Sequence, residues 1–328
     1  MKKFQHIYIE ESILEHPNTK TILNKFPEAV KIEISNYKRI FNKSNQDFLL
    51  QKNNLKLILA KKNDNFLYKG STNSNDFGNE NFYYNTLILN CIYDCEYCFL
   101  QGMFNSANIV LFVNTEDFFM ETKNFLEKES LYLCLSYETD LLAFEDIYPY
   151  TREWIKFAYK NPNLKIEIRT KSNYFDRISD LNPSKNIIFA WTLSPSYVIK
   201  SFEHKTPNLN TRLKNIKKAI ELGWNVRICF DPILPIENWK TYYSDLIMIC
   251  NDSIDWNKLY DISIGTFRIN KDYLKKIKKI RTNSSLIYYP FEHKENISQI
   301  PSNKKTEMIE FISSLILEKI EKNKLYIS

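Results

Sequence analysis

Cys91, Cys95 and Cys98 lie close together in the chain, directly after an apolar run at residues 83–89 that is typical of a β-strand. Clustered cysteine thiolates are the usual ligands of iron–sulfur clusters, and such clusters commonly take four of them. Three thiolates at this spacing can hold one cluster and leave one iron open to a ligand that is not protein. The spacing therefore indicates an iron–sulfur centre with an open coordination position.

Two other interpretations of these cysteines stay open at this point. A zinc site normally uses four ligands from paired motifs, and three buried thiols can also lie together by chance. However, half of the six cysteines in the chain lie in this segment, and Tyr97 and Phe99 flank the last of them. These observations favour the iron–sulfur cluster.

The spacing resembles the motif of the radical S-adenosylmethionine (SAM) superfamily: cysteine, three residues, cysteine, two residues, cysteine. The resemblance implies a [4Fe-4S] cluster whose fourth iron is chelated by the amino and carboxylate groups of SAM. It also implies reductive cleavage of SAM to a 5'-deoxyadenosyl radical and an external electron donor of the flavodoxin or ferredoxin type.

The 328-residue chain is long enough for two domains or for one large α/β unit with an extension. Its formal net charge of +6 is compatible with a polyanionic partner but does not require one. We find no signal-peptide pattern and no apolar run of about 20 residues, so we expect no membrane segment. We expect a cytoplasmic protein, because thiols stay reduced there.

From residue 82 onward, apolar runs of five to eight residues alternate with segments of helical length. This alternation predicts repeated βα units and a parallel sheet, whose sites gather at the carboxyl ends of the strands. The apolar runs lie at residues 83–89, 109–113, 131–135, 164–170, 187–193, 226–233 and 262–268, and helical patterns at 116–128, 208–222 and 242–251.

The alternation predicts an α/β fold with a barrel or partial barrel. The radical SAM resemblance implies that this is a partial (β/α)6 TIM-like barrel of that type at residues 81–283, with a small N-terminal α/β extension at residues 1–80. Within that extension, the polar residues 42–54 are expected to form a solvated loop. Residues 284–328 are expected to pack on the barrel, with an amphipathic helix near residues 306–319.

Several motifs beyond the cysteines resemble the spore photoproduct lyase family and its wider lyase-like branch. They occur in the same order as in the family, at residues 58–70, 91–101, 194–207, 230–233 and 265–268. The resemblance implies repair of a thymine-dimer lesion in DNA. The adenosyl radical would remove a hydrogen from C6 of the lesion, the methylene cross-link would break, a hydrogen atom would return, and SAM would be regenerated.

Two positions depart from the family pattern. In the segment at residues 136–140, Tyr137 occupies the place of the cysteine that returns the hydrogen atom in the lyases. Phe99 replaces the second of two tyrosines, so of that pair only Tyr97 remains as a candidate catalytic residue. A tyrosyl O–H can donate a hydrogen atom, and Cys134 is a second candidate donor, although an in-strand thiol is usually core. A different chemistry is the third possibility.

Four residues are predicted to bind the cofactor. The match to the family's Thr-Lys pair implies that Lys171 holds the SAM carboxylate, and Ser194 is expected to contact SAM through its hydroxyl or backbone. Asp231 could orient SAM or substrate, or form an ion pair that ties strand ends together. Thr139 lies in the same segment as Tyr137 and is assigned to the same cofactor site.

Three functions stay in competition. The first is a radical SAM lyase that repairs thymine-dimer DNA lesions, with DNA as its partner. The second is a radical SAM enzyme of the same branch with another substrate, because Tyr137 replaces the donor cysteine. The third is a non-catalytic iron–sulfur protein that binds nucleic acid. A basic stretch at residues 271–281 could track phosphates or simply be solvated.

Overall fold

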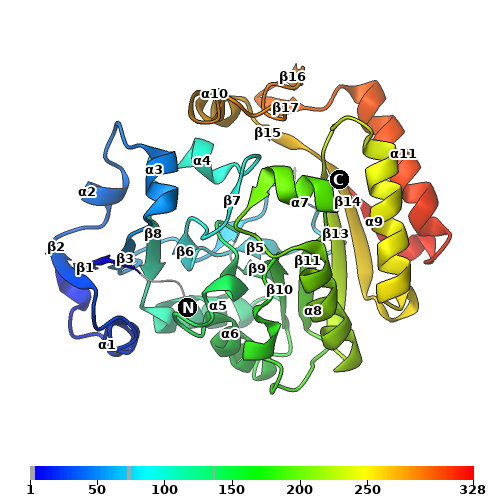
Figure 1. Ribbon diagram of the computed structural model, residues 1–328. Coiled ribbons are helices and arrows are strands. Elements are labelled where there is room, and N and C mark those ends of the chain that lie inside the picture. The colour runs from blue at the N-terminus through cyan, green and yellow to red at the C-terminus, as the bar shows by residue number, and fades with distance from the viewer. Residues whose placement is uncertain (1–3, 72–74, 136) are drawn as a thin grey trace.

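The computed structural model describes residues 4–71, 75–135 and 137–328. Its described strands form a smaller N-terminal sheet, at the left of Figure 1, and a larger curled sheet to its right. In the described part of the chain the larger sheet has eight strands in the order β18-β14-β13-β11-β10-β9-β5-β4. This sheet is the barrel predicted from the alternation of apolar runs.

The middle of the curled sheet consists of six parallel strands that follow the chain order. Parallel β18 and antiparallel β4 add to its two edges. The bounds are β4 (Tyr68–Lys69), β5 (Phe82–Tyr84), β9 (Leu131–Leu135), β10 (Leu164–Thr170), β11 (Ile187–Thr192), β13 (Asn225–Ile233), β14 (Asp261–Thr266) and β18 (Leu325–Ile327). This topology confirms the predicted partial (β/α)6 barrel.

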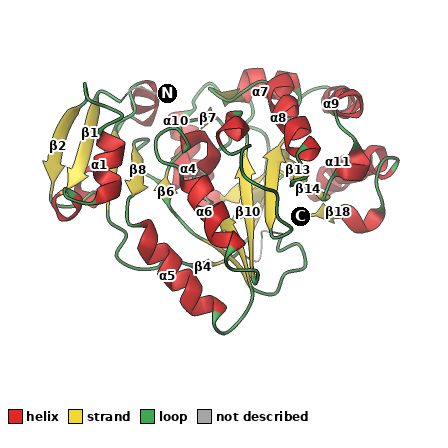
Figure 2. Cartoon of the chain, turned by 90° about the horizontal axis from the view of Figure 1, so that it is seen from below, coloured by secondary structure: helices red, strands yellow, loops and turns green. Residues whose placement is uncertain are grey.

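Helices cover the outside of the curled sheet, as Figure 2 shows from below. Every residue of β11 and of β14 is buried, because one face of the sheet meets helices and the other faces the barrel interior. The helices are α5 (Thr115–Leu126), α6 (Tyr150–Tyr159), α7 (Ser196–Phe202), α8 (Leu209–Glu221), α9 (Trp239–Ser253) and α11 (Ser302–Leu317). Three of them, α5, α8 and α9, confirm the predicted helical patterns.

The N-terminal sheet joins strands from both sides of residue 80. Its bounds are β1 (His6–Glu10), β2 (Val30–Ile34), β3 (Leu57–Ala60), β8 (Ile109–Phe112) and β6 (Ile88–Leu89). All neighbours are parallel except β6, which pairs antiparallel with β8. Strand β3 lies before residue 80 and β8 lies after it, and the two pair in one sheet. The domain boundary at residue 80 stays a prediction.

Two local predictions are wrong. The run at residues 83–89 is not one strand, because β5 belongs to the curled sheet and β6 to the N-terminal sheet. The polar segment at residues 42–54 is not all loop, because it contains α3 (Phe48–Asn53). The side chain of Asp47 caps this helix by accepting a 2.8 Å hydrogen bond from the Leu50 N–H. Phe48 and Lys52 are buried on its inner face.

The C-terminal part returns to the barrel. Met308, Ile312 and Ile316 of α11 are buried, and the helix packs on α9 and β14, as the amphipathic pattern predicted. In Figure 1, α10 (Lys271–Ile280) and the small sheet of β15 (Arg268–Asn270), β16 (Glu292–Lys294) and β17 (Ile297–Gln299) lie above the barrel. None of the described helices is both long and apolar enough to span a membrane.

The remaining elements are short. They are α1 (Pro17–Leu23), α2 (Lys38–Phe41), α4 (Leu100–Met103), β7 (Asp94–Cys95), β12 (Glu203–His204), and the 3-10 helices η1 (Glu11–Ile13), η2 (Leu141–Phe144), η3 (Tyr174–Arg177), η4 (Trp256–Lys258) and η5 (Lys322–Lys324). Strands β7 and β12 pair antiparallel, so the segment at residues 203–204 lies directly beside the cysteine loop.

Candidate active site

A cavity of about 650 Å³ lies at the carboxyl ends of the barrel strands. Thr170 and Lys171 from the end of β10, Asp231 from β13 and Thr266 from the end of β14 all line it. In parallel α/β barrels this end carries the site, because side chains from several strands and loops converge there. This cavity is therefore the candidate active site.

All three cysteines of the predicted cluster motif line this cavity as free thiols. Cys91 follows β6, Cys95 ends β7, and Cys98 lies in a turn in which its N–H donates to the Cys95 carbonyl over 3.1 Å. Asn90 begins the loop with a φ of 68°, a left-handed conformation that asparagine tolerates. Its side-chain amide donates to the carbonyls of Ser106 (2.7 Å) and Asn108 (2.8 Å) and so fixes where the loop starts.

Two polar side chains hold the carbonyls of the cysteine loop. The ammonium of Lys52 donates to the Cys91 carbonyl over 2.6 Å and to the Tyr93 carbonyl over 2.7 Å. The Gln101 amide donates to the carbonyls of Cys95 (3.0 Å) and Glu96 (2.7 Å). Because their hydrogen bonds reach both halves of the loop, these two residues fix the backbone that carries the thiols.

The residues present fit a [4Fe-4S] cluster. Burial raises the pKa of Cys91 to about 11 and also raises the pKa of Cys95 and Cys98, so the thiols are neutral until they ligate iron and become thiolates. Three thiols on one loop that line one cavity match the thiolate chemistry of an iron–sulfur cluster and leave one coordination position to a ligand that is not protein. A structural zinc site normally uses four protein ligands.

Tyr97 belongs to a buried network behind the cysteine loop. Its hydroxyl donates to the Glu203 carboxylate, which also accepts from the Ser194 hydroxyl (2.8 Å) and from the Arg212 guanidinium. Burial disfavours the charged carboxylate, but the charges of Arg212 and Lys171 outweigh it and lower the pKa of Glu203 to about 2. The carboxylate therefore stays ionised and keeps Tyr97 protonated as a donor.

Ser194 is the one predicted cofactor residue that does not line the cavity. It is buried, and its hydroxyl is directed to Glu203. This geometry favours a role in positioning Glu203 over a hydroxyl contact with SAM, and the contact through its backbone stays a prediction.

Lys171 and Thr139 offer the cavity polar side-chain groups that form no hydrogen bond within the described residues. The Lys171 ammonium lies 5.5 Å from the centre of the Tyr97 ring. Within the described residues it makes no hydrogen bond or ion pair. Burial opposes its charge, but Glu203 and Cys95 raise its pKa, so it stays cationic. The Thr139 hydroxyl is buried and likewise lacks a hydrogen-bond partner in the described part of the chain. Both groups suit an anionic, hydrogen-bonding ligand.

Asp231 lines the cavity and lies near two arginines. Its carboxylate is 3.3 Å from Arg268 and 3.9 Å from Arg169. These ion pairs fit the prediction that Asp231 ties strand ends together, and they leave its contact with SAM or substrate as a prediction.

Both candidate hydrogen donors, Tyr137 and Cys134, line the cavity. Tyr137 is 38% exposed, its ring centre lies 4.7 Å from that of Tyr84 at 33°, and Phe99 lies 6.0 Å away. Cys134 is buried on β9, and burial raises its pKa. Ser136, which begins the family segment, lies outside the described residues. The structure brings both candidates to the cavity, while their roles stay predictions.

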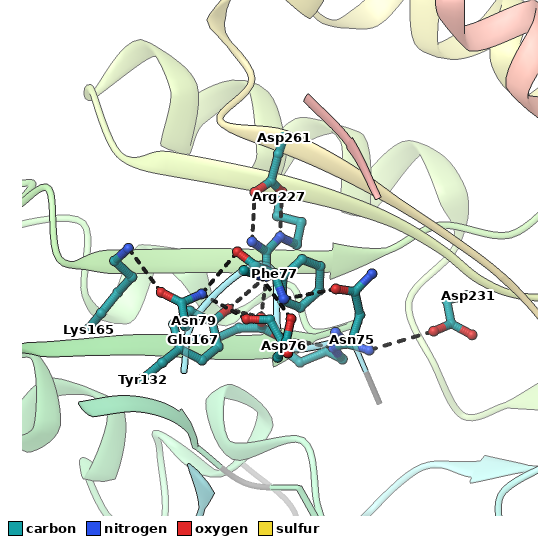
Figure 3. A network of polar contacts seen from close by, with 12 residues as sticks. Asn75, Asp76, Phe77, Asn79, Tyr132, Lys165, Glu167, Arg227, Asp231 and Asp261 are labelled. Carbon is teal, nitrogen blue, oxygen red and sulfur yellow. Dashed lines mark hydrogen bonds and ion pairs between the residues drawn. The ribbon is translucent and has the colours of Figure 1, made fainter. Parts of the chain in front are cut away.

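A buried charge network of the barrel strands lies beside residues 75–79, as Figure 3 shows. The Arg227 guanidinium pairs with Glu167 and with Asp261, and it lies 3.3 Å from the centre of the Phe77 ring. Glu167 also accepts a hydrogen bond from the Tyr132 hydroxyl. Glu167 and Phe77 also line the cavity, so this network forms part of its wall.

Lys52, Gln101 and Arg227 support the site and were not predicted from the sequence. Gln101 lies inside the family motif at residues 91–101, so its place in that motif was an available signal. Lys52 and Arg227 act across long sequence separations and had no local signal.

The fold and the cysteine loop define a partial barrel of the radical SAM type. The model of the spore photoproduct lyase family matches residues 3–294, so the chain belongs to the spore photoproduct lyase family. This match confirms the resemblance of the separate motifs.

Among curated proteins, spore photoproduct lyase of Clostridium acetobutylicum is 23% identical over 212 residues, which cover 61% of this chain and 60% of the relative. The Bacillus subtilis lyase is 23% identical over 194 residues, covering 58% and 56%. The chain thus matches somewhat less than two thirds of the length of these relatives.

Solved structures show the same fold over nearly the full length. A spore photoproduct lyase variant aligns with a TM-score of 0.85 and 18% identity, covering 99% of both chains. A lyase complexed with dinucleoside spore photoproduct gives a TM-score of 0.84 at 17% identity and covers 99% of this chain and 98% of that chain. Another lyase variant, with bound AdoMet and the same dinucleoside, gives 0.83 at 18% identity and covers 99% of both chains.

Proposed function

We propose that this chain is a radical SAM lyase that repairs spore photoproduct, a thymine-dimer lesion of DNA. The observation that carries the proposal is that the thiols of Cys91, Cys95 and Cys98 open into the same cavity as Tyr137 and Lys171. Family membership and a lyase of the same fold with bound AdoMet and dinucleoside spore photoproduct support it.

The three cysteines would hold a [4Fe-4S] cluster, and the cavity would hold SAM. Together these cofactors supply reductive cleavage of SAM to a 5'-deoxyadenosyl radical. The Lys171 ammonium is suited to bind the SAM carboxylate, since it is cationic and lacks an acidic partner in the described chain. The Thr139 hydroxyl can donate or accept a hydrogen bond with the same ligand, and the Asp231 carboxylate can accept one from it.

Tyr137 is the proposed donor of the returning hydrogen atom. Its phenolic O–H would transfer that atom to the substrate-derived carbon radical and leave a tyrosyl radical, which would take a hydrogen atom from 5'-deoxyadenosine as SAM is regenerated. The Tyr137 ring lies 4.7 Å from that of Tyr84, tilted by 33°. Tyr97 and Cys134 are second candidates. Tyr97 is less available, because its hydroxyl is held by Glu203 behind the cysteine loop.

DNA is the proposed partner, and α10 is the proposed contact with its phosphates. Tyr273 of α10 lines the cavity, while Lys271, Lys275, Lys276 and Lys279 on the same helix are exposed. No ion pair of these four lysines is present among the described residues. Unpaired cations beside a cavity mouth suit a phosphodiester backbone.

A second function keeps the same site but changes the substrate, and the tyrosine in place of the donor cysteine favours it. In that case SAM need not be regenerated, and 5'-deoxyadenosine and methionine would accumulate. Either proposal includes an external electron donor of the flavodoxin or ferredoxin type and a cytoplasmic location.

The experiment uses the full chain, reconstituted anaerobically with iron and sulfide and reduced with dithionite. SAM and a spore photoproduct oligonucleotide are added, and thymine products, SAM and 5'-deoxyadenosine are quantified. SAM-dependent conversion of the lesion with SAM recovered supports the lyase. SAM cleavage with the lesion intact supports the alternative substrate. A loaded cluster that binds no SAM, or zinc in its place, supports the non-catalytic nucleic-acid-binding protein.

A further inference from the structure

Lys52 reaches from the N-terminal sheet region into the cysteine loop. It lies on α3 and is only 5% exposed, although lysine is among the residues most rarely buried. Its ammonium donates to the Cys91 and Tyr93 carbonyls at 2.6 and 2.7 Å and lies 5.6 Å from the Phe48 ring centre. Two short hydrogen bonds therefore fix a positive charge against the loop that carries the thiols.

No carboxylate of the described residues forms an ion pair with this ammonium. Within the described residues Lys52 forms no ion pair, whereas Arg281, which also supports the loop, is paired with Asp94. The Lys205 ammonium donates to the Lys52 carbonyl over 2.5 Å and thereby adds a second cation near the same turn. A buried ammonium is costly without an opposite charge. The Asp94 carboxylate in this region is already paired with Arg281, and a bound cluster would add negatively charged thiolates beside Lys52.

The Lys52 charge lies close to the cluster ligands. Its ammonium donates to the Cys91 carbonyl, so the charge is held at a residue that would ligate iron. A fixed cation favours whichever state of its neighbour is more negative. A reduced cluster carries one more electron than an oxidised cluster, so the same cation favours reduction.

We propose that Lys52 is a positioning residue that provides the counter-charge of the cluster, holding the Cys91–Tyr93 backbone and making one-electron reduction of the cluster more favourable. The inference rests on the proposed function only in requiring that the cysteines bind a [4Fe-4S] cluster. It requires neither a particular substrate nor SAM turnover.

The test compares Lys52→Met, Lys52→Gln and Lys52→Arg with the wild-type chain. Met removes the charge and the donors, Gln keeps a neutral donor, and Arg keeps the charge. Lys56→Met is the matched control, because the Lys56 ammonium contacts Tyr8 in the N-terminal sheet instead of the cysteine loop. Each full chain is reconstituted anaerobically, its iron and sulfide are counted, and its reduction is titrated by electron paramagnetic resonance.

We expect the equilibrium constant for one-electron reduction of the cluster to be at least tenfold lower in the Met and Gln variants than in wild type. A tenfold change equals about 59 mV for a one-electron couple. The Arg variant and Lys56→Met should stay within about threefold of wild type. If Lys52→Met does not retain iron, the Gln and Arg variants decide, and equal potentials for these two overturn the inference. A loaded Lys52→Met with the wild-type potential also overturns it. Failure of wild type to form any cluster overturns both the inference and the proposed function.

Discussion

Replacement of Arg227 by Met is expected to destabilise the chain strongly. The substitution leaves the carboxylates of Glu167 and Asp261 buried without their shared cation and removes the guanidinium from the Phe77 ring. Their side chains are only 1% and 5% exposed, so water cannot replace the lost partner.

The expected loss follows from these contacts. Removing one partner of a buried ion pair costs about 3–5 kcal/mol, and a desolvated cation–π contact contributes about 2 kcal/mol. Glu167 keeps a 3.0 Å contact with Arg169, so the full sum is not reached. We expect a loss of about 4 kcal/mol in the free energy of unfolding, against a typical total of about 5–15 kcal/mol.

The assay is urea unfolding of the full chain, followed by circular dichroism and tryptophan fluorescence under anaerobic reducing conditions. Combining Arg227→Met with Glu167→Gln and Asp261→Asn should recover about half of the loss, because no buried charge is then left unpaired. Arg177→Met is the control: this side chain is 57% exposed in its pair with Asp146 and should cost less than about 1 kcal/mol. A loss below about 1 kcal/mol for Arg227→Met alone would refute the reasoning.

Three further predictions concern the site, the partner and pH. Tyr137→Phe should lower repaired product at least tenfold while SAM is still cleaved, as measured by chromatography, because the phenolic hydrogen is lost. Replacing Lys275, Lys276 and Lys279 with Gln should reduce the slope of log affinity for DNA against log salt by roughly two to three. Glu145 is buried, which raises its pKa to about 7. Its neutral form is therefore favoured in the fold, and stability present below about pH 4.5 should be lost as pH rises through 7. Glu145→Gln should abolish that loss in urea titrations.

Each of these has a matched control. Tyr197→Phe changes an exposed tyrosine that does not line the cavity and should leave product unchanged. An unchanged yield for Tyr137→Phe would remove Tyr137 as donor. Replacing exposed Lys160 and Lys217, which do not lie on α10, should leave the salt slope unchanged, and equal effects of both sets would exclude α10 as the contact. For Glu145, a pH profile identical to that of the Gln variant contradicts the assignment.

The sequence predicted the barrel well because each apolar run is bounded by polar or helical segments. The run at residues 131–135, for example, became β9 without change. The prediction failed at residues 83–89, because an apolar run cannot show that it changes sheets at Asn85–Leu87. It failed at residues 42–54 because the burial of Lys52 depends on the cysteine loop, about 40 residues further along the chain.

The sequence also predicted part of the site. The cysteine spacing and the family motifs pointed to Cys91, Cys95, Cys98 and Lys171, and all four line one cavity. Local patterns could not show that the Ser194 hydroxyl would be directed to Glu203, since that choice depends on how β12 pairs with the cysteine loop.

The proposed function is repair of a DNA lesion in the cavity beside the cysteine loop. The most direct measurement is mass spectrometry of a spore photoproduct dinucleotide after incubation with the reduced, cluster-loaded chain and SAM. We expect the lesion to be converted to two thymines. This conversion should depend on SAM and should be lost in the Cys98→Ala variant. Cleavage of SAM to 5'-deoxyadenosine and methionine with the lesion unchanged would contradict it.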